Sequence, residues 1–574
     1  MENLGLKFDI PHWDHVLTHP AVVAVFLGAL CLGLHHSALS GGWRYDDGAH
    51  LYFSLRHAPW QYFFVPDVMR EQSWAHFAPW NAFFYEIGLP YFGLNPLGHY
   101  AHLLGVLWAT SVATFYLLRL WISPFSALMG SVLFLAMPST GAVAQLLMTG
   151  HYAYGLLFSV LVFYFFVRGV RENRIRYSFL AAIFYFLACW SKELYAPIIT
   201  ILFFLPEGGW RERFRHLRPV VVIACIYGIY RLVVLHGVGG YGSNSATNIP
   251  MTSETIVRFL TSMMGDGWSW LLIVGYLGIL VLFALIMRIR KVNLLFLLGC
   301  CITLIAPIIP VLHSDFAYDG LRFLFFLSWS LAIMLVWFSG SGKLSSLALL
   351  IVTIMLVFSQ QITVSKLLDR VIVMDQEGLF LVEKGHESIL LPLELENDML
   401  ANLNYIQMAV MLSNQNNQKP ILQDKLELVG MGEEMGSTVY QFDNRCQCMQ
   451  PLGIEKYRRI TDDFQVSLLA GSDQQIHVLL EIDGKGFRKR LQWQFGGAEG
   501  SYLLKIREYA ALPLPATGKM NFGTVGAFDQ LLHVYVQLTS PDGWIARSPV
   551  FEIDPRLNSR IIWSGKSVIN LPTY

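Results

Sequence analysis

Two adjacent carboxylates, Asp46 and Asp47, stand in the stretch GGWRYDDGAHLYF at residues 41–53. A carboxylate of ordinary pKa is a weak base in water, but a like charge beside it and partial removal from water raise its proton affinity. Such a pair could accept a proton from an incoming hydroxyl group. The alternative is that both are solvated loop acids or that one of them caps a helix. The dipeptide alone does not decide between these interpretations.

Cationic side chains form the second candidate group. Lys192 and Glu193 lie in CWSKELYAP between two apolar runs, Arg231 lies in YGIYRLVVLHG, and Arg322 follows HSDFAYDG. Ionisable residues at membrane depth are costly and usually face a cavity or each other. The three cations could hold a phosphate through charge-assisted hydrogen bonds. The alternatives are a structural ion pair at Lys192 and Glu193, and arginines that extend along the helix towards the surface.

Other polar residues are weaker candidates for substrate contacts: Glu193, His151, Tyr241 and His313. A histidine at a membrane interface is more often a belt or capping residue than a catalyst. No cluster of ligands in the sequence points to a metal site, and the sequence leaves open whether a divalent metal serves as a cofactor.

These residues belong to a very apolar chain of 574 residues, with 54% hydrophobic and 14% charged residues and a mean hydropathy of +0.46. This composition excludes an ordinary soluble enzyme and predicts a polytopic α-helical membrane protein. A net charge of +0 provides no field to attract nucleic acid. We expect about eleven transmembrane helices, near residues 16–36, 98–120, 124–138, 152–168, 177–190, 194–206, 219–236, 268–288, 293–312, 323–339 and 344–362.

The orientation follows from the positive charges of the connecting loops. RGVRENRIR, RERFRHLR and RIRK fall on one side of this arrangement, which should be cytoplasmic. The acids and the cations then share the outer face. The chain has no N-x-[ST] sequence, which favours the periplasmic side of a bacterial inner membrane over an ER lumen. The first outer loop, residues 37–97, is rich in Trp, Tyr, Phe and Pro, which suits interfacial helices at headgroup level.

A change of composition near residue 362 divides the chain into a membrane domain, residues 1–362, and a soluble domain, residues 363–574. Stretches such as IHVLLEIDG and LHVYVQLTSPDGW alternate in polarity between turn residues, which predicts a β-rich, sandwich-like fold on the periplasmic side. Cys446 and Cys448 lie in this region. Their C-x-C spacing leaves a local disulfide or free thiols open, and it lacks the second ligand pair of a zinc site.

Together these residues predict a cavity that opens to the outside, with a carboxylate base opposite a cationic site for a phosphate. The outer side of the membrane has no ATP, so the phosphate must belong to another molecule. A lipid-linked phosphosugar meets this need, because its polyprenyl tail lies in the bilayer and its sugar–phosphate bond supplies the driving force. The alternatives are a transporter or flippase that binds the same phosphate without chemistry, although no paired halves with broken helices are evident, and an O-antigen-type polymerase or ligase with a diphosphate-linked donor.

An ordered series of segments covers roughly residues 20–340: YDDGAH, FAPWNAFFYEIGLPYFGLNPLGHYAHLL, SKE before an apolar run, YRLVVLHGVGGYG and YDGLRFLFFLSW. The series resembles the bacterial relatives of protein O-mannosyltransferases and of the transmembrane TPR-containing O-mannosyltransferases, within the GT-C glycosyltransferase superfamily. The chain departs from them in having LRFLF where relatives often show GRYLYLP. It also has a β-rich tail where some carry TPR repeats, which leaves the acceptor unassigned.

The resemblance implies an inverting glycosyltransferase that moves one sugar from a polyprenyl (undecaprenyl) monophosphate carrier to an acceptor hydroxyl of a protein or glycan. The role of base would fall on Asp46 or Asp47. The role of binding the donor phosphate would fall on Lys192 and Arg322, and we add Arg231 as a helper.

Overall fold

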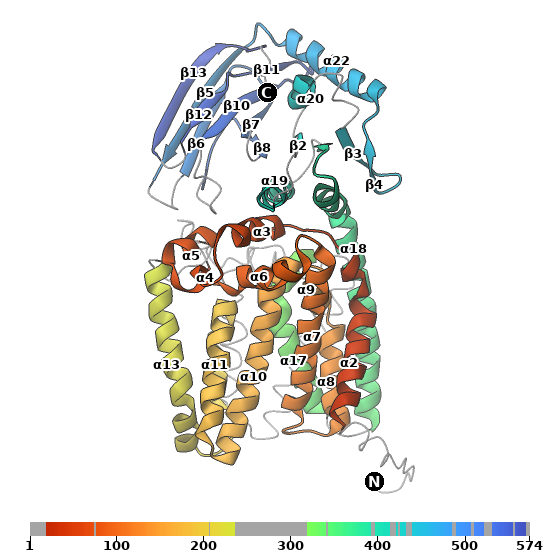
Figure 1. Cartoon of the computed structure of the whole chain (residues 1–574), viewed down its shortest axis with the longest axis vertical. Helices are drawn as coiled ribbons and strands as arrows, with labels where there is room; N and C mark the ends of the chain where they lie inside the picture. The colour runs from red at the N-terminus through yellow and green to blue at the C-terminus, as the bar shows by residue number, and fades with distance from the viewer. Residues whose placement is uncertain are drawn as a thin grey trace. The chain divides into compact units, whose positions relative to one another are not determined.

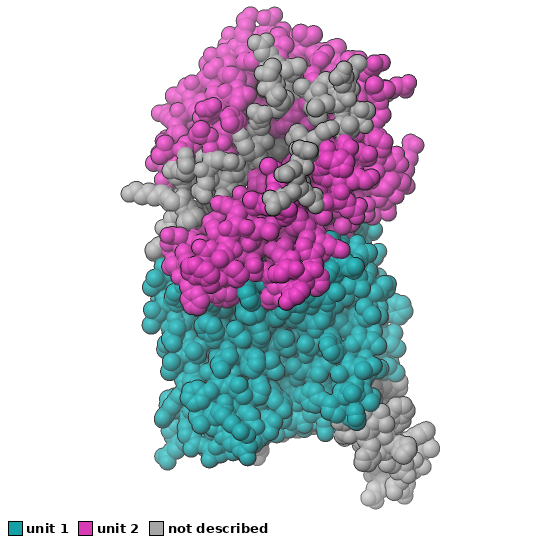
Figure 2. Space-filling view, in the orientation of Figure 1, with its two compact units in different colours: residues 1–41, 75–84, 96–370 teal, residues 42–74, 85–95, 371–574 magenta. Residues whose placement is uncertain are grey.

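The computed structural model describes residues 19–73, 76–205, 207–235, 318–339, 343–391, 397–413, 421–422, 425–431, 439–484, 490–506, 510–521, 531–554 and 557–569 (Figure 1). The chain divides into two compact units. The first comprises residues 1–41, 75–84 and 96–370, and the second comprises residues 42–74, 85–95 and 371–574 (Figure 2). The second unit therefore combines part of the first predicted outer loop with the C-terminal part of the chain.

Long apolar helices that run alongside one another form the first unit (Figure 1). Among the described residues, six helices are long and apolar enough to cross a membrane, or seven if the bent pair α8 and α9 is one span. The helices of this unit are α2 (Pro20–His35), α7 (Pro96–Leu118), α8 (Pro124–Ala136), α9 (Pro138–Ala144), α10 (Gly150–Glu172), α11 (Ile175–Ser191), α12 (Ile198–Phe204), α13 (Trp210–Leu235), α17 (Phe325–Ser339) and the start of α18 (Lys343–Lys384). Short 3-10 turns are η1 (His36–Ser40), η2 (Leu147–Thr149), η3 (Glu193–Tyr195) and η6 (Tyr318–Leu324).

The chain is thus a multi-pass helical membrane protein, in agreement with the sequence. The predicted number of spans is not confirmed. The spans predicted near residues 177–190 and 194–206 correspond to two shorter apolar helices, Ile175–Ser191 and Glu193–Phe204. Those predicted near residues 268–288 and 293–312 lie outside the described residues.

The hairpin between α10 and α11 shows how local sequence sets the position of the candidate cations. α10 ends at Glu172. The next residue, Asn173, has a left-handed φ of 53° and donates its N–H to the carbonyl of Gly169. Asparagine tolerates this conformation better than most residues. The chain then reverses, and α11 packs along α10 until Ser191. Lys192 follows directly in an extended conformation, so this hairpin determines where Lys192 and Glu193 leave the helix.

The first outer loop folds into short helices: α3 (Asp47–Arg56), α4 (Gln61–Phe64), α5 (Pro66–Gln72) and α6 (Trp80–Phe92). Several of its aromatic side chains are exposed, with Trp60 at 58%, Phe64 at 69% and Tyr91 at 81% of full exposure. Exposed rings of this kind suit the interfacial helices that the sequence predicts for residues 37–97.

Helix α18 continues to Lys384, well past residue 362, where the last predicted span ends. Beyond residue 362 the composition of the helix becomes polar. Buried apolar side chains nevertheless continue at intervals of three and four residues, at Val364, Leu367, Val371 and Met374. This spacing places them on one face of a helix, so helical packing persists after the hydropathy has fallen. The predicted domain boundary at residue 362 falls inside this helix and stays a prediction.

The C-terminal region is β-rich, as predicted. A small sheet has the order β2-β1-β3-β4, and two antiparallel sheets have the orders β11-β10-β7-β8, with β12 beside β10, and β13-β5-β6-β9. The strands are β1 (Ser388–Leu390), β2 (Ile421–Leu422), β3 (Val439–Asp443), β4 (Cys448–Pro451), β5 (Gln475–Asp483), β6 (Arg490–Gly496), β7 (Ser501–Ile506), β8 (Ala510–Leu514), β9 (Thr517–Asn521), β10 (Leu532–Thr539), β11 (Ile545–Arg547), β12 (Phe551–Ile553) and β13 (Ser559–Lys566).

Three helices also belong to this region: α19 (Asn397–Leu412), α20 (Lys425–Met431) and α22 (Ile454–Ala470). Alternate residues of β5, from Ile476 to Ile482, are buried, which is the period of a half-buried strand. Phe464 and Leu468 of α22 pack with Tyr535 of β10 and Ile545 of β11, so that α22 covers the second sheet.

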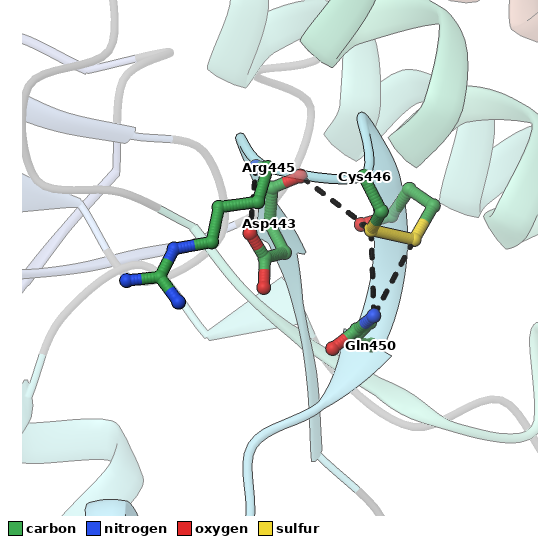
Figure 3. Close-up of a disulfide and its surroundings, with 5 residues drawn as sticks. Asp443, Arg445, Cys446 and Gln450 are labelled. Atoms are coloured by element: carbon green, nitrogen blue, oxygen red, sulfur yellow. Dashed lines mark hydrogen bonds between the residues drawn. A yellow bond between two sulfur atoms is a disulfide. The ribbon is translucent and has the colours of Figure 1, made fainter.

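The hairpin that joins β3 and β4 carries a disulfide between Cys446 and Cys448 (Figure 3). The intervening Gln447 has a left-handed φ of 52°. The side-chain amide of Gln450 lies 3.4 Å from the sulfur of Cys446 and 3.7 Å from that of Cys448. The structure therefore contains the local disulfide that the C-x-C spacing left open.

Candidate active site

The turn before α3 gives its two acids different environments. Asp46 is exposed and precedes the helix, and its side chain makes no capping hydrogen bond. Asp47 is the first residue of α3 and is fully buried. One oxygen of its carboxylate accepts the backbone N–H of Arg44 at 2.7 Å, and the other accepts the hydroxyl of Tyr85 at 2.5 Å. Of the two predicted bases, the buried one is the better placed to be activated.

Burial raises the pKa of Asp47 from its usual 3.8 to about 7, although the hydrogen bonds from Tyr85 and Arg44 and the charge of Arg44 act in the opposite direction. A carboxyl with this pKa is partly ionised near neutral pH. It can therefore take up a proton under physiological conditions, as a general base must. Asp47 thus has the electrostatic property that the sequence could only suggest for the acidic pair.

The sequence did not identify Tyr85 as a member of the site. Tyr85 lies on α6, 38 residues after Asp47, and its side chain is fully buried. The segment FAPWNAFFYEIGLPYFG holds many aromatic residues, all of which suit an interfacial helix. A buried hydroxyl that needs an acceptor is distinguishable from its neighbours only once the fold has placed it.

Two of the three predicted cations lie beside Tyr152 of α10, in the first unit. The ammonium of Lys192 lies 5.4 Å from the centre of the Tyr152 ring. Arg322, in the turn η6, forms a side-chain hydrogen bond with Tyr152. The two predicted phosphate ligands, which are far apart in the sequence, are thus brought to one tyrosine. Tyr152 is a second residue that the sequence did not single out, although it follows His151.

Packing holds Tyr152 in place from the side of η3. The hydroxyl of Tyr195 donates a 2.7 Å hydrogen bond to the backbone carbonyl of Tyr152. The ring of Tyr195 lies against Gly155, where a Cβ atom would be 2.2 Å from a ring carbon. Glycine is needed at this point because any larger residue would displace the ring.

Glu193 makes an ion-pair cluster beside Lys192. His76 forms a hydrogen bond with one oxygen of its carboxylate, and Arg231 lies 4.0 Å from the other. Glu193 thus contacts His76 and Arg231, and the structural ion pair between Lys192 and Glu193 that the sequence left open stays a prediction. His76 was not predicted.

Aromatic rings line the same region. Trp190 stacks on Tyr230 with 5.7 Å between ring centres, and Phe77 meets both rings edge-on at 5.2 and 5.4 Å. Lys192 follows Trp190 by two residues, and Arg231 follows Tyr230 directly. Phe77 and Trp190 are buried, so this aromatic cluster belongs to the packing that supports the segments carrying Lys192 and Arg231.

The other residues that the sequence suggested for substrate contacts are His151, Tyr241 and His313. His151 is buried, with its ring 4.5 Å from that of Tyr152. Tyr241 and His313 lie outside the described residues. Asp46 and Asp47 belong to the second unit and the cations to the first. In the part of the chain that the structure describes, no group of three His, Cys, Asp or Glu side chains could hold a metal ion.

No family model matches the chain, and no curated protein matches it significantly. Among solved structures, the chain is similar to the crystal structure of ArnT from Cupriavidus metallidurans bound to undecaprenyl phosphate. The TM-score is 0.36 and the identity 15%, over 68% of this chain and 74% of that one. A likeness this weak does not define the fold.

Proposed function

We propose that the chain is an inverting glycosyltransferase of the GT-C type, which transfers a sugar from a polyprenyl monophosphate to an acceptor hydroxyl on a protein or glycan. The buried carboxyl of Asp47, with its pKa of about 7, is the observation that carries this proposal. The ordered series of segments that resembles O-mannosyltransferase relatives supports the class of enzyme. The basic connecting loops support a reaction at the periplasmic face.

In the proposed reaction, the acceptor oxygen attacks the anomeric carbon while its proton passes to the carboxylate of Asp47. The bond between this carbon and the phosphate oxygen breaks, and its electron pair leaves with the lipid phosphate. Attack from the side opposite the leaving group inverts the anomeric configuration. The exposed Asp46 takes no part in the proton transfer and helps only by its charge, which raises the proton affinity of Asp47.

The leaving phosphate is the other place where charge develops, because a diester with one negative charge becomes a monoester with two. Lys192 and Arg322 stabilise this added charge, with Arg231 as a more distant helper. Stabilisation of developing charge by fixed cations is usually the largest single contribution to catalysis. Glu193 neutralises part of the cluster and holds Arg231 and His76 in place.

The test uses the purified full-length protein in lipid nanodiscs. It is given radiolabelled undecaprenyl-phosphate sugars and a crude periplasmic acceptor fraction. Release of undecaprenyl phosphate together with a labelled acceptor is the expected result. We expect Asp47→Asn to lower the rate by at least about 100-fold and Asp46→Asn to lower it far less. Glu383→Gln, which removes an exposed acid from α18, is the matched control.

Three results would contradict the proposal. Binding of the labelled lipid without turnover would favour a transporter or flippase. A requirement for a diphosphate-linked oligosaccharide would favour a polymerase or ligase. Equal losses in Asp46→Asn and Asp47→Asn would remove the argument from burial.

A further inference from the structure

The turn that carries Asp47 is bonded to the last part of α18 and to α19, which belong with it to the second unit. The guanidinium of Arg44 is 1% exposed and forms two hydrogen bonds to Asp375 on α18, of 2.6 Å from Nε and 2.5 Å from a terminal nitrogen. The backbone N–H of Gly42 donates to the same carboxylate at 3.0 Å. A Cβ atom on Gly42 would lie 2.8 Å from the Cα of Asp375, so the turn and α18 are in direct backbone contact.

Asn402 on α19 holds the other side of the turn. Its side-chain oxygen accepts the backbone N–H of Gly48 at 2.7 Å, and its side-chain nitrogen donates to the carbonyl of Trp43 at 3.2 Å. A Cβ atom on Gly48 would lie 2.3 Å from the carbonyl oxygen of Asn402. One amide side chain therefore bridges the residues on both sides of the Asp46–Asp47 pair.

We propose that Asp375 and Asn402 are positioning residues for Asp47, through which α18 and α19 set the place and the charge state of the base. The proposal rests on the function proposed above. Asp375 acts through Arg44, since the same residue whose guanidinium is fixed by Asp375 donates its backbone N–H to Asp47. Asn402 acts through Gly48, the residue that follows Asp47.

The charges around Asp47 make the role of Asp375 testable. Arg44 and Asp46 of the turn and Tyr85 of α6 are the groups that act on Asp47 directly, and α19 contributes the uncharged Asn402. Asp375 of α18 neutralises Arg44. In Asp375→Asn, Arg44 keeps its charge without a compensating carboxylate, so Asp47 should lose its proton at lower pH. In Asn402→Asp, a new negative charge should have the opposite effect.

The experiment compares the pH dependence of kcat/KM for sugar transfer in Asp375→Asn, Asp375→Glu, Asn402→Asp and the control Glu383→Gln. We expect Asp375→Asn to lower kcat by about 10- to 100-fold, as a small displacement of a catalytic group can, and to shift the acid limb of the profile to lower pH. Asp375→Glu keeps the charge, so its acid limb should stay near that of the wild type while kcat falls. Asn402→Asp should shift the acid limb to higher pH.

The inference and the proposed function fail in different ways. An inactive wild type would overturn the proposed function itself. An active wild type that loses its activity in Asp47→Asn, together with profiles for Asp375→Asn and Asn402→Asp that match Glu383→Gln, would overturn only the positioning role. A fall in kcat for both variants without opposite shifts of the acid limb would also overturn it, because it would indicate general damage to the fold. If Asp375→Asn does not fold, Asp375→Glu and Asn402→Asp carry the same test.

Discussion

The raised pKa of Asp47 has a consequence for stability that can be measured without any substrate. A carboxyl whose pKa is higher in the folded than in the unfolded chain binds its proton more tightly when folded. The contribution of Asp47 to stability is therefore most favourable below pH 4, where Asp47 is protonated in both states. This contribution is lost as the pH rises from about 4 to about 7, and the loss is essentially complete above pH 7.

The size of this effect follows from the shift itself. A change from 3.8 to about 7 is roughly three pKa units, and each unit corresponds to about 1.4 kcal/mol, so the ionised form costs the fold about 4 kcal/mol. Asp47 is fully buried, so water does not screen the effect. Asp47→Asn keeps the shape of the neutral acid and cannot ionise. Between pH 5 and pH 8 the variant should gain about 3 kcal/mol relative to the wild type.

The assay is thermal unfolding of the detergent-solubilised protein at several values between pH 5 and pH 8. The gap in apparent Tm between Asp47→Asn and the wild type should widen in favour of the variant as the pH rises. Glu383→Gln, which removes an exposed carboxyl, serves as the control and should run parallel to the wild type. If Asp47→Asn also runs parallel to the wild type, the carboxyl has an ordinary pKa and the case for a base at this position fails.

Three further predictions concern single side chains. Tyr85→Phe removes a hydrogen bond that lowers the pKa of Asp47, so the acid limb of the activity profile should move to higher pH, as kinetics at fixed ionic strength would show. Arg322→Gln should raise the KM for the lipid donor and lower kcat, since its charge is assigned to the phosphate in both the ground and the transition state; titration with the donor separates the two effects. Replacing Cys446 and Cys448 with serine should cost no more than about 1.5 kcal/mol in thermal unfolding, because the loop that the disulfide closes is very short.

The sequence predicted the parts of the site that depend on local order along the chain. Lys192 and Glu193 were recognisable because charges between two apolar runs are costly. The environment of Asp47 was not predictable, because Asp375 and Asn402 lie 331 and 354 residues away from the turn residues that they contact. From the sequence alone, each acid of YDD could be either solvated or buried, because the contacts that fix the turn come from residues far along the chain.

The fold also contains features that a local sequence pattern predicts and features that it does not. The alternation of apolar residues in IHVLLEIDG specified a strand, and β5 forms there. A hydropathy window could not show that α18 continues to Lys384, because the window measures average polarity while the helix depends on the spacing of a few buried residues. The window therefore detects the part of the helix that suits lipid and misses the part that packs against protein.

Several costly features coincide at the turn before α3. It holds a buried carboxyl of raised pKa, a buried pair between Arg44 and Asp375, and a left-handed φ of 50° at the non-glycine residue Tyr45. Buried ion pairs often contribute less than well-packed apolar residues of the same volume, and a non-glycine residue at positive φ is strained. The C-terminal region also has features of this kind. Buried Lys505 of β7 lies 3.5 Å from Glu427 of α20, and Gln447, between β3 and β4, has a left-handed φ of 52°. Three unfavourable features within a few residues are better explained by function, because stability alone would have selected apolar residues in place of the buried charges and glycine at the left-handed position.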